Sequence, residues 1–277
     1  MKTSTQLKAR VRNLSREKHV EAEVILRNFM LERLLERIAA SKYKNNFILK
    51  GGMLIAAMVG IDTRTTMDLN ASIKGQSLTE TGTIAIMQDI LRVTVNDNVT
   101  LAFSGIEEIR EEADYPGFRV SIDAILDKTR QTLKVDITTG DFITPREIEY
   151  RFPLMFEDRT IGILSYTPET ILAEKFETII TRGVTNTRMR DFYDIHILTV
   201  TQTIRMDIFR AALHATAEKR HTSQQMRDVS DVIQTIADSG IMAKLWRRYQ
   251  AKYHYAADIT WETAVAALWK LAQVNLA

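Results

Sequence analysis

The chain has 277 residues, 45% of them hydrophobic and 26% charged, which is ordinary for a globular protein with a sizeable core. The absence of cysteine excludes thiol catalysis, disulfides and cysteine-ligated zinc. The net charge of +2 gives no bulk electrostatic argument for nucleic acid. The first ten residues lack the apolar core of a signal peptide, and no stretch approaches the roughly 20 apolar residues that span a bilayer. We therefore expect a cytoplasmic protein with no membrane partner.

The N-terminal part of the chain switches between helical and extended patterns. The expected elements are a helix over 15–40, a strand over 47–49, a helix over 53–59, a strand from 65 to 73, a helix over 78–92, and strands over 99–103, 118–126 and 133–138. Residues 148–166 are expected to be extended, and Pro153 confines any strand there to an edge or an end. These patterns predict an α+β fold for this part.

Beyond residue 167 the pattern is almost wholly helical. Thr167 is a suitable N-cap, because Pro168 can occupy the first helical position and Glu169 the first turn. The expected helices are 168–182, 188–200, 205–219, 222–239 and 259–275. We therefore expect an α/β core over 1–166 and a helical C-terminal domain over 167–277.

A pair of glycines follows the first strand. Leu49 and Lys50 lead into Gly51 and Gly52, and an apolar helix begins directly after them. Glycine lets the backbone approach a ligand closely, and the free N–H groups of a helix N-terminus suit a phosphate. A tight turn without a ligand remains the alternative interpretation of this segment.

Polar residues alternate along the expected strand that follows. Thr66, Asp68 and Asn70 fall on one face of it, and two oxygen-bearing side chains two residues apart can share one Mg²⁺. A polar face turned to solvent is the alternative. Asp136 can add a carboxylate if its strand lies next to this one, which the sequence does not establish.

Two charged residues occupy the apolar stripes of consecutive helices. Lys175 falls between Ile171 and Ile179, and Asp191 falls between Ile195 and Leu198. A charge on a core-facing stripe is costly unless it is paired, so the two residues are natural partners. Either they form a purely structural ion pair, or they line a cleft in which Lys175 binds phosphates and Asp191 orients it or assists proton transfer.

In their order and spacing these segments resemble the AbiEii/AbiGii-type nucleotidyltransferase toxins, to which the MenT toxins are related. The matching segments are Leu49-Lys50-Gly51-Gly52, Thr66-Met67-Asp68-Leu69-Asn70, Val135-Asp136-Ile137 with Gly140-Asp141, Leu172-Ala173-Glu174-Lys175, and Arg190-Asp191-Phe192-Tyr193-Asp194. The resemblance covers roughly residues 45–200.

The resemblance implies a polymerase-β-like nucleotidyltransferase core with a mixed sheet and a helical C-terminal region. It also implies a toxin of a type IV toxin–antitoxin system, in a family partly linked to abortive infection, with an antitoxin encoded by a neighbouring gene. The donor would be a nucleoside triphosphate and the acceptor a hydroxyl, for some relatives that of tRNA.

The resemblance also assigns roles to residues. Lys50, Gly51, Gly52, Thr66 and Lys175 would bind the nucleotide. Asp68, Asn70 and Asp136 would bind Mg²⁺, and Asp68, Lys175 and Asp191 would be catalytic, while Asp194 would be structural.

One position departs from the family pattern. The family has Asp-x-Asp where this chain has Asp68-Leu69-Asn70, and Asn70 brings a carbonyl oxygen but no negative charge. The number of metal ions therefore stays open between one and two. Two other functions stay open as well: transfer of the γ-phosphate to a hydroxyl, as in a kinase, and a degenerate site that binds nucleotide and regulates without turnover.

Overall fold

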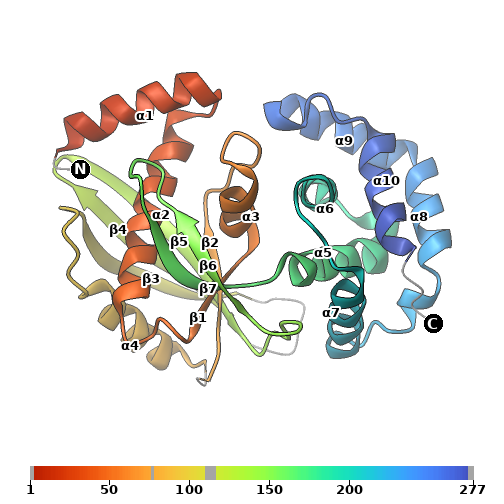
Figure 1. Cartoon of the computed structure of the whole chain (residues 1–277), viewed down its shortest axis with the longest axis horizontal. Helices are drawn as coiled ribbons and strands as arrows, with labels where there is room; N and C mark the ends of the chain where they lie inside the picture. Colours follow the sequence, from red (N-terminus) through yellow and green to blue (C-terminus); the bar gives the residue numbers. More distant parts are fainter. Residues whose placement is uncertain (1–2, 76–77, 110–116, 274–277) are drawn as a thin grey trace. The chain divides into compact units, whose positions relative to one another are not determined.

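The computed structural model describes residues 3–75, 78–109 and 117–273, which divide into two compact units (Figure 1). Unit 1 lies within residues 1–141 and 148–165, and unit 2 within 142–147 and 166–277. Unit 1 contains α1 (Ser4–Lys18), α2 (Ala22–Ala40), β1 (Phe47–Lys50), α3 (Gly51–Val59), β2 (Leu69–Ile73), α4 (Glu80–Leu91), β3 (Thr100–Ile109), β4 (Gly117–Leu126), β5 (Thr129–Thr139), β6 (Ile148–Pro153) and β7 (Thr160–Ser165).

The strands of unit 1 form one seven-stranded mixed sheet in the order β3-β4-β5-β2-β1-β7-β6. Strand β2 is parallel to β5 and β1 is parallel to β7, whereas the other neighbours are antiparallel. Strand β6 is an edge strand and ends at Pro153, as expected of a residue that cannot donate to the ladder. The predicted α+β class with a mixed sheet is confirmed.

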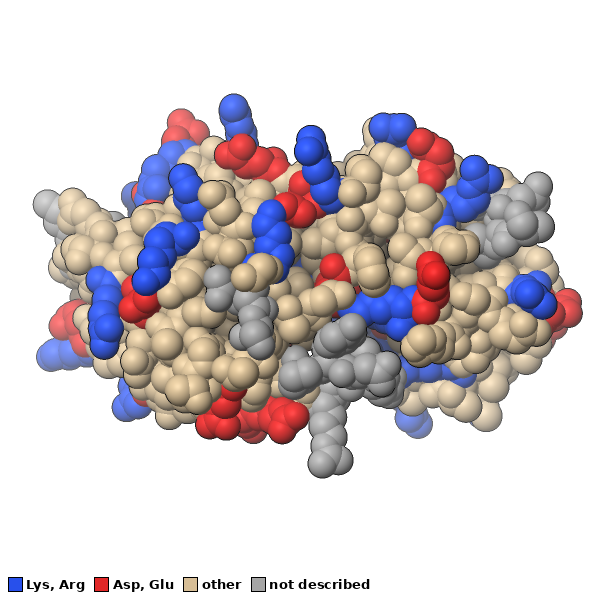
Figure 2. Space-filling view, turned by 90° about the horizontal axis from the view of Figure 1, so that it is seen from below, with Lys and Arg blue, Asp and Glu red and all other residues tan. Residues whose placement is uncertain are grey.

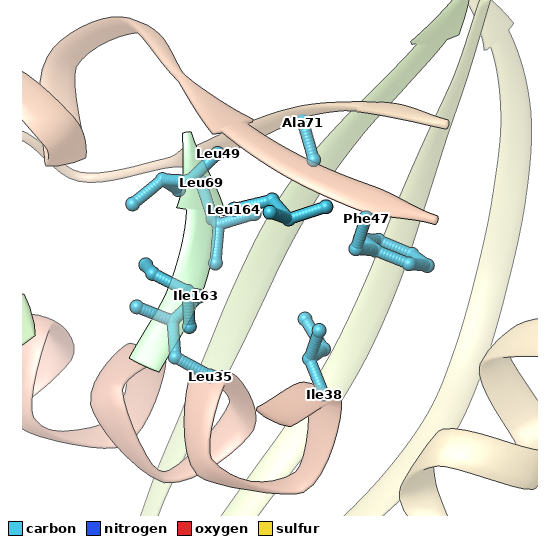
Figure 3. A pocket seen from close by; sticks show the side chains of 8 residues that line it. All are labelled: Leu35, Ile38, Phe47, Leu49, Leu69, Ala71, Ile163 and Leu164. Carbon is cyan, nitrogen blue, oxygen red and sulfur yellow. The ribbon is translucent and has the colours of Figure 1, made fainter. Parts of the chain in front are cut away.

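The core of unit 1 lies between α2 and one face of this sheet. Figure 3 shows Leu35 and Ile38 of α2 pointing toward Leu49 of β1 and toward Leu69 and Ala71 of β2. The small pocket among them is lined by apolar side chains, most of them buried, so it belongs to the hydrophobic core. Because strand side chains alternate, Asn70, which lies between Leu69 and Ala71, faces the opposite side of the sheet.

The N-terminal helix differs from its prediction. A single helix was expected over 15–40, but α1 ends at Lys18 and α2 begins at Ala22. His19 adopts a left-handed conformation with φ 52°, and its N–H bonds to the carbonyl of Ser15. This is a helix stop of the kind usually made by glycine, which is why the sequence did not reveal it.

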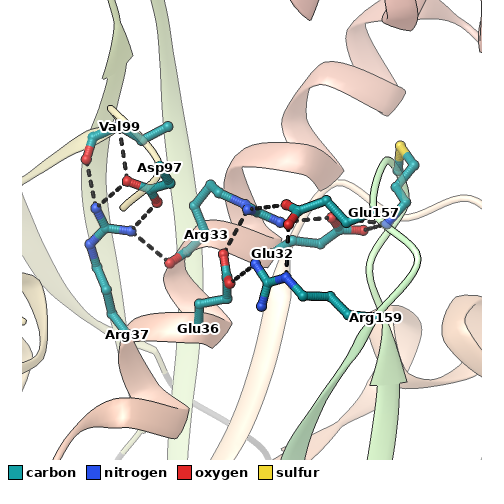
Figure 4. A network of polar contacts seen from close by, with 9 residues as sticks. Glu32, Arg33, Glu36, Arg37, Asp97, Val99, Glu157 and Arg159 are labelled. Carbon is teal, nitrogen blue, oxygen red and sulfur yellow. Dashed lines mark hydrogen bonds and ion pairs between the residues drawn. The ribbon is translucent and has the colours of Figure 1, made fainter. Parts of the chain in front are cut away.

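A network of charged side chains is buried on α2 (Figure 4). Arg33 lies 2.7 Å from Glu36 and 2.7 Å from Glu157, and Arg37 lies 2.6 Å from Asp97. Arg33 and Arg37 are each about 5% exposed or less. Buried arginines of this kind are stable only when paired, so the network fixes the segments after α4 and β6 to α2.

Unit 2 is helical, as predicted. It contains α5 (Pro168–Arg182), α6 (Met189–Thr201), α7 (Met206–Lys219), α8 (Val229–Asp238), α9 (Gly240–Lys252) and α10 (Trp261–Ala272). Thr167 caps α5, since its hydroxyl accepts a hydrogen bond from the N–H of Thr170. None of the helices in the described part of the chain is both long and apolar enough to cross a membrane.

Two predictions for unit 2 are wrong. Helix α8 begins at Val229 rather than near residue 222, and α9 was not expected. The Ser239-Gly240 pair resembles the end of a helix, but here it starts one. The Ser239 hydroxyl caps α9 by accepting from the N–H of Met242, and Gly240 is the first helical residue.

Candidate active site

A row of polar side chains crosses four strands of unit 1 on the face of the sheet opposite α2. Lys50 of β1 pairs with Asn70 of β2, Asn70 pairs with Asp136 of β5, and Asp136 pairs with Arg119 of β4. The sequence left the pairing of the strands of Asn70 and Asp136 open, and the structure places them side by side. Four polar residues from distant parts of the chain therefore meet in one row.

The two glycines lie at one end of this row, at the start of α3. Gly51 has φ +69°, and a Cβ on it would lie 2.6 Å from Nδ2 of Asn70. A Cβ on Gly52 would lie 2.8 Å from Oγ1 of Thr66. Lys50 is the N-cap of α3, and its side chain makes no capping hydrogen bond. The glycines thus let the helix N-terminus press against β2 and the segment before it, with backbone N–H groups left for a ligand.

Asp68 lies outside the strand in which it was expected. Strand β2 begins at Leu69, Met67 and Asp68 form a bend before it, and the Thr66 hydroxyl donates to the carbonyl of Asp68 at 3.2 Å. The strand predicted from 65 to 73 therefore begins only at Leu69, and Thr66 and Asp68 precede it. Asn70 lies beside Gly51 and Thr66 lies beside Gly52, so both side chains are close to the start of α3.

Asp136 is bound to an arginine that the sequence analysis missed. Nε of Arg119 lies 2.7 Å from Oδ1 of Asp136, and Nη2 lies 2.8 Å from Oδ2. The hydrogen bonds to Asp136 raise the pKa of Arg119, and the negative charge of Asp68 adds to this shift. A signal for this pair exists in the sequence, because the two-residue turn between Leu126 and Thr129 determines the register of the hairpin.

Lys50 also has a partner. Its ammonium lies 2.9 Å from Oδ2 of Asp141, which also accepts a hydrogen bond from the Thr138 hydroxyl at 2.9 Å. Both ends of the Lys50–Asp141 pair are 12% exposed. The pair holds Lys50 at the N-terminus of α3 and gives Asp141, which had no predicted role, a positioning function.

The residues of this row fit a divalent cation. Oδ1 of Asn70 is buried and accepts no hydrogen bond, and Asp68 supplies a half-buried carboxylate close to it in the chain. Hard cations such as Mg²⁺ prefer such oxygens and commonly take only one or two protein carboxylates together with substrate phosphates. Over the described ranges, no three or more His, Asp or Glu side chains are grouped so that they could hold a metal ion. These residues therefore fit a cation whose remaining ligands come from the phosphates of a bound molecule.

A second polar centre lies within unit 2, where α5 and α6 meet. Nζ of Lys175 lies 2.5 Å from Oδ1 of Asp191 and 2.8 Å from Oδ2 of Asp194. The predicted pairing of Lys175 with Asp191 is confirmed as a contact. Asp194, to which the resemblance gives a structural role, is 0% exposed and shares the same ammonium.

The charge state of Lys175 follows from these contacts. Burial lowers the pKa of its ammonium, but the attraction of Asp191 and Asp194 is greater in sum, and the net shift is upward. Lys175 is therefore a cation whose charge is more than balanced by two carboxylates. Such a lysine is held in one orientation and does not serve as a neutral base.

The face of the molecule seen in Figure 2 carries charges of both signs. Figure 2 shows Lys and Arg side chains interspersed with Asp and Glu over the face in view, with no broad area of one sign. This agrees with the small net charge of +2. The two polar centres are identified by their partly buried contacts.

Comparison with known proteins identifies relatives. The family model described as nucleotidyl transferase AbiEii toxin, type IV TA system, matches residues 33–267. No curated protein matches the sequence. Among solved structures, a putative nucleotidyltransferase from H. pylori is 15% identical with a TM-score of 0.48, covering 91% of this chain and 96% of that one.

Two further solved structures are similar. A second Helicobacter pylori protein is 15% identical with a TM-score of 0.49, covering 91% of this chain and 93% of that one. An antigenic nucleotidyltransferase-like protein from Paracoccidioides brasiliensis is 14% identical with a TM-score of 0.36, covering 84% and 94%.

Proposed function

The chain belongs to the nucleotidyl transferase AbiEii toxin family, and from that premise we propose that it transfers a nucleotide from a nucleoside triphosphate to an acceptor hydroxyl. The observation that carries this proposal is the start of α3. There the Gly51-Gly52 pair, the unsatisfied amide oxygen of Asn70 and the hydroxyl of Thr66 come together. This combination of backbone N–H groups and oxygen ligands suits a triphosphate with its cation.

In this proposal the phosphates bind at the N-terminus of α3. Gly51 and Gly52 leave room for backbone N–H groups to reach phosphate oxygens, and Lys50 and Thr66 stand beside them. Asp68 and Asn70 would hold Mg²⁺, and Asp136 would add an oxygen only when Arg119 releases it. When bound, the cation would neutralise phosphate charge.

The reaction is a single displacement. The oxygen of the acceptor hydroxyl forms a bond to the α-phosphorus, the bond to the bridging oxygen breaks, and pyrophosphate leaves with the electron pair. The proton of the hydroxyl must be removed, and Asp191 is the carboxylate that we assign to this step or to the orientation of Lys175. The family resemblance gives Lys175 a share in the reaction, and we propose that it contributes positive charge.

The test is transfer of label from α-³²P nucleoside triphosphates to total RNA and to protein. Asp68→Asn and Lys175→Met should each lower transfer by at least about 100-fold, because the reaction depends on positioning and charge. Asp123→Asn is the matched control, since Asp123 is a carboxylate of the same sheet that pairs with Arg130 away from the row. Full transfer by both site variants would refute the assignment. Label transferred from the γ position instead would indicate a kinase.

We propose tRNA as the first acceptor to be tried and the product of the neighbouring gene as the antitoxin. The family description places these proteins in type IV toxin–antitoxin systems, which implies an antitoxin partner. Both expectations are tested directly, by fractionating the labelled RNA and by co-expressing the adjacent gene.

One observation favours a second candidate function. Asn70 lacks a charge, and Arg119 neutralises Asp136, so the row carries less negative charge than three carboxylates would. This reduced negative charge is sufficient for a regulator that binds a nucleotide without turnover. Mg²⁺-dependent binding of a nucleotide without transfer to any RNA or protein fraction would support that alternative.

A further inference from the structure

Arg119 occupies a position in the polar row that the proposed reaction does not use. Its guanidinium makes a bidentate contact with Asp136, with Nε to Oδ1 at 2.7 Å and Nη2 to Oδ2 at 2.8 Å. Both oxygens of the carboxylate accept a charge-assisted hydrogen bond in this arrangement, the strongest and most directional kind that arginine forms. Asp136 is 19% exposed and Arg119 31% exposed, so the pair is only partly screened by solvent.

The charge of the row decides how many cations it can hold. Asp68, which lies just before the row in the chain, and Asp136 each carry one negative charge, Asn70 carries none and Arg119 carries one positive charge. The positive charge of Lys50 is offset by Asp141 at 2.9 Å, so these residues together have a single net negative charge. Two divalent cations need several carboxylates to offset their charge. One Mg²⁺ needs only one carboxylate, because the phosphates of its ligand supply the remaining negative charge.

We propose that Arg119 is a built-in counter-cation that withholds Asp136 from metal binding, so that this chain binds one divalent cation with its nucleotide, at Asp68 and Asn70. This inference rests on the proposed function, because it concerns the cation that accompanies the triphosphate. Glu107 of β3 lies 3.8 Å from Arg119 and is 65% exposed, and it helps hold the guanidinium on this side of β4.

The test counts Mn²⁺ ions bound per chain by electron paramagnetic resonance. The full chain is titrated with Mn²⁺ in the presence of a triphosphate with a methylene group between its α- and β-phosphorus, one nucleotide at a time for all four bases. Wild type should bind one Mn²⁺. Arg119→Met should bind two, because it frees the Asp136 carboxylate. Asp68→Asn should bind Mn²⁺ at least about tenfold more weakly than wild type, since it removes a ligand.

Two variants serve as controls. Arg130→Met breaks a similar pair, Arg130 with Asp123 at 2.6 Å, on the same two strands but outside the row, and it should still bind one ion. The double variant Arg119→Met/Asp136→Asn removes the pair without changing the net charge. It should bind one ion with an affinity close to that of wild type, because Asp136 is not a ligand.

Three results would overturn the inference. These are two ions bound to wild type, one ion bound to folded Arg119→Met, or loss of Mn²⁺ binding in the double variant. Circular dichroism checks the fold of each variant, and two ions bound to wild type would overturn the inference even if Arg119→Met does not fold. The failure of the proposed function looks different. In that case no nucleotide binds and no label is transferred, whereas transfer with two bound ions refutes only this inference.

Discussion

The ammonium of Lys175 lies 2.8 Å from the carboxylate of Asp194, which is 0% exposed, and 2.5 Å from that of Asp191, which is 13% exposed. One cation is thus shared between a fully buried carboxylate and a partly accessible one. Removing one partner of a buried pair leaves the other uncompensated, so depth of burial predicts the cost. This difference separates a structural role from a chemical one.

We expect Asp194→Asn to lower the free energy of unfolding by about 3 kcal/mol, the magnitude typical of breaking a buried pair. Asp191→Asn should cost about 1 kcal/mol or less, because its site is closer to solvent. Urea denaturation of the two variants measures both values. An equal loss of stability in the two variants would contradict this assignment.

In the transfer assay, Asp191→Asn should be the more damaging variant, although Asp194→Asn should lose more stability. Asp191→Asn should lower transfer at least about 100-fold, as expected when a group that assists proton transfer is lost. Asp194→Asn should retain more activity per folded molecule. A fully active Asp191→Asn protein would leave Asp191 with a structural role only.

Gly51 and Gly75 provide a matched pair for testing the close approach at α3. Both have positive φ, +69° and +70°, but a Cβ on Gly51 would lie 2.6 Å from Asn70, whereas among the described residues the nearest atom to a Cβ on Gly75 would be Nδ2 of Asn46 at 3.7 Å. Gly75→Ala should therefore cost about 1 kcal/mol of stability for its backbone conformation alone. Gly51→Ala should cost clearly more, and it should also weaken nucleotide binding.

A double variant identifies the source of the extra cost. If crowding against Asn70 is responsible, Gly51→Ala/Asn70→Ala should be more stable than the sum of the single effects allows. Thermal denaturation of the four proteins completes this cycle. Strictly additive effects would show that Asn70 is not what keeps residue 51 a glycine.

Glu32 in the α2 network should make stability depend on pH near neutrality. Burial raises the pKa of Glu32 from 4.5 to about 8, against the opposing effects of Arg33 and of the hydrogen bond from the N–H of Met155. The folded state therefore keeps its proton where the unfolded chain has lost it. The resulting stabilisation is fully present below pH 4.5 and is lost as the pH rises through about 8.

Glu32→Gln should remove this contribution and flatten the dependence of the melting temperature on pH, measured from about pH 5 to about pH 9. Glu23→Gln is the control, because Glu23 lies on the same helix, is 61% exposed and pairs with Arg27. It should leave the wild-type profile unchanged. A Glu32→Gln profile parallel to that of wild type would show that Glu32 titrates normally.

Expression of the chain alone in a bacterial host should arrest growth, since family members are toxins. Asp68→Asn should abolish the arrest at equal protein level, because we attribute toxicity to transfer. Colony counts after induction, with immunoblots for protein level, measure this. Arrest by wild type and by Asp68→Asn alike would separate toxicity from the proposed chemistry.

Much of the fold could be predicted from local pattern. The alternation over 118–126 predicted β4 to within one residue of its observed start at Gly117, and the Thr167-Pro168 cap predicted the start of α5. Helix boundaries were mispredicted where a residue occupied a position that its residue type rarely occupies. His19 stops a helix as glycine usually does, and Gly240 begins one. At both places a local hydrogen bond accompanies the change, from the N–H of His19 to the carbonyl of Ser15 and from the N–H of Met242 to the hydroxyl of Ser239.

The amino-acid sequence alone determined the fold class, the helical C-terminal part and the pairing of Lys175 with Asp191. Helical periodicity carries that information within a few turns of chain. Only the tertiary structure decided which side chains share the polar row. The contact of Asn70 with Gly51 and the engagement of Asp136 by Arg119 depend on the order and register of strands. Periodicity gives the face on which a strand residue lies, but it does not say which strand lies beside it.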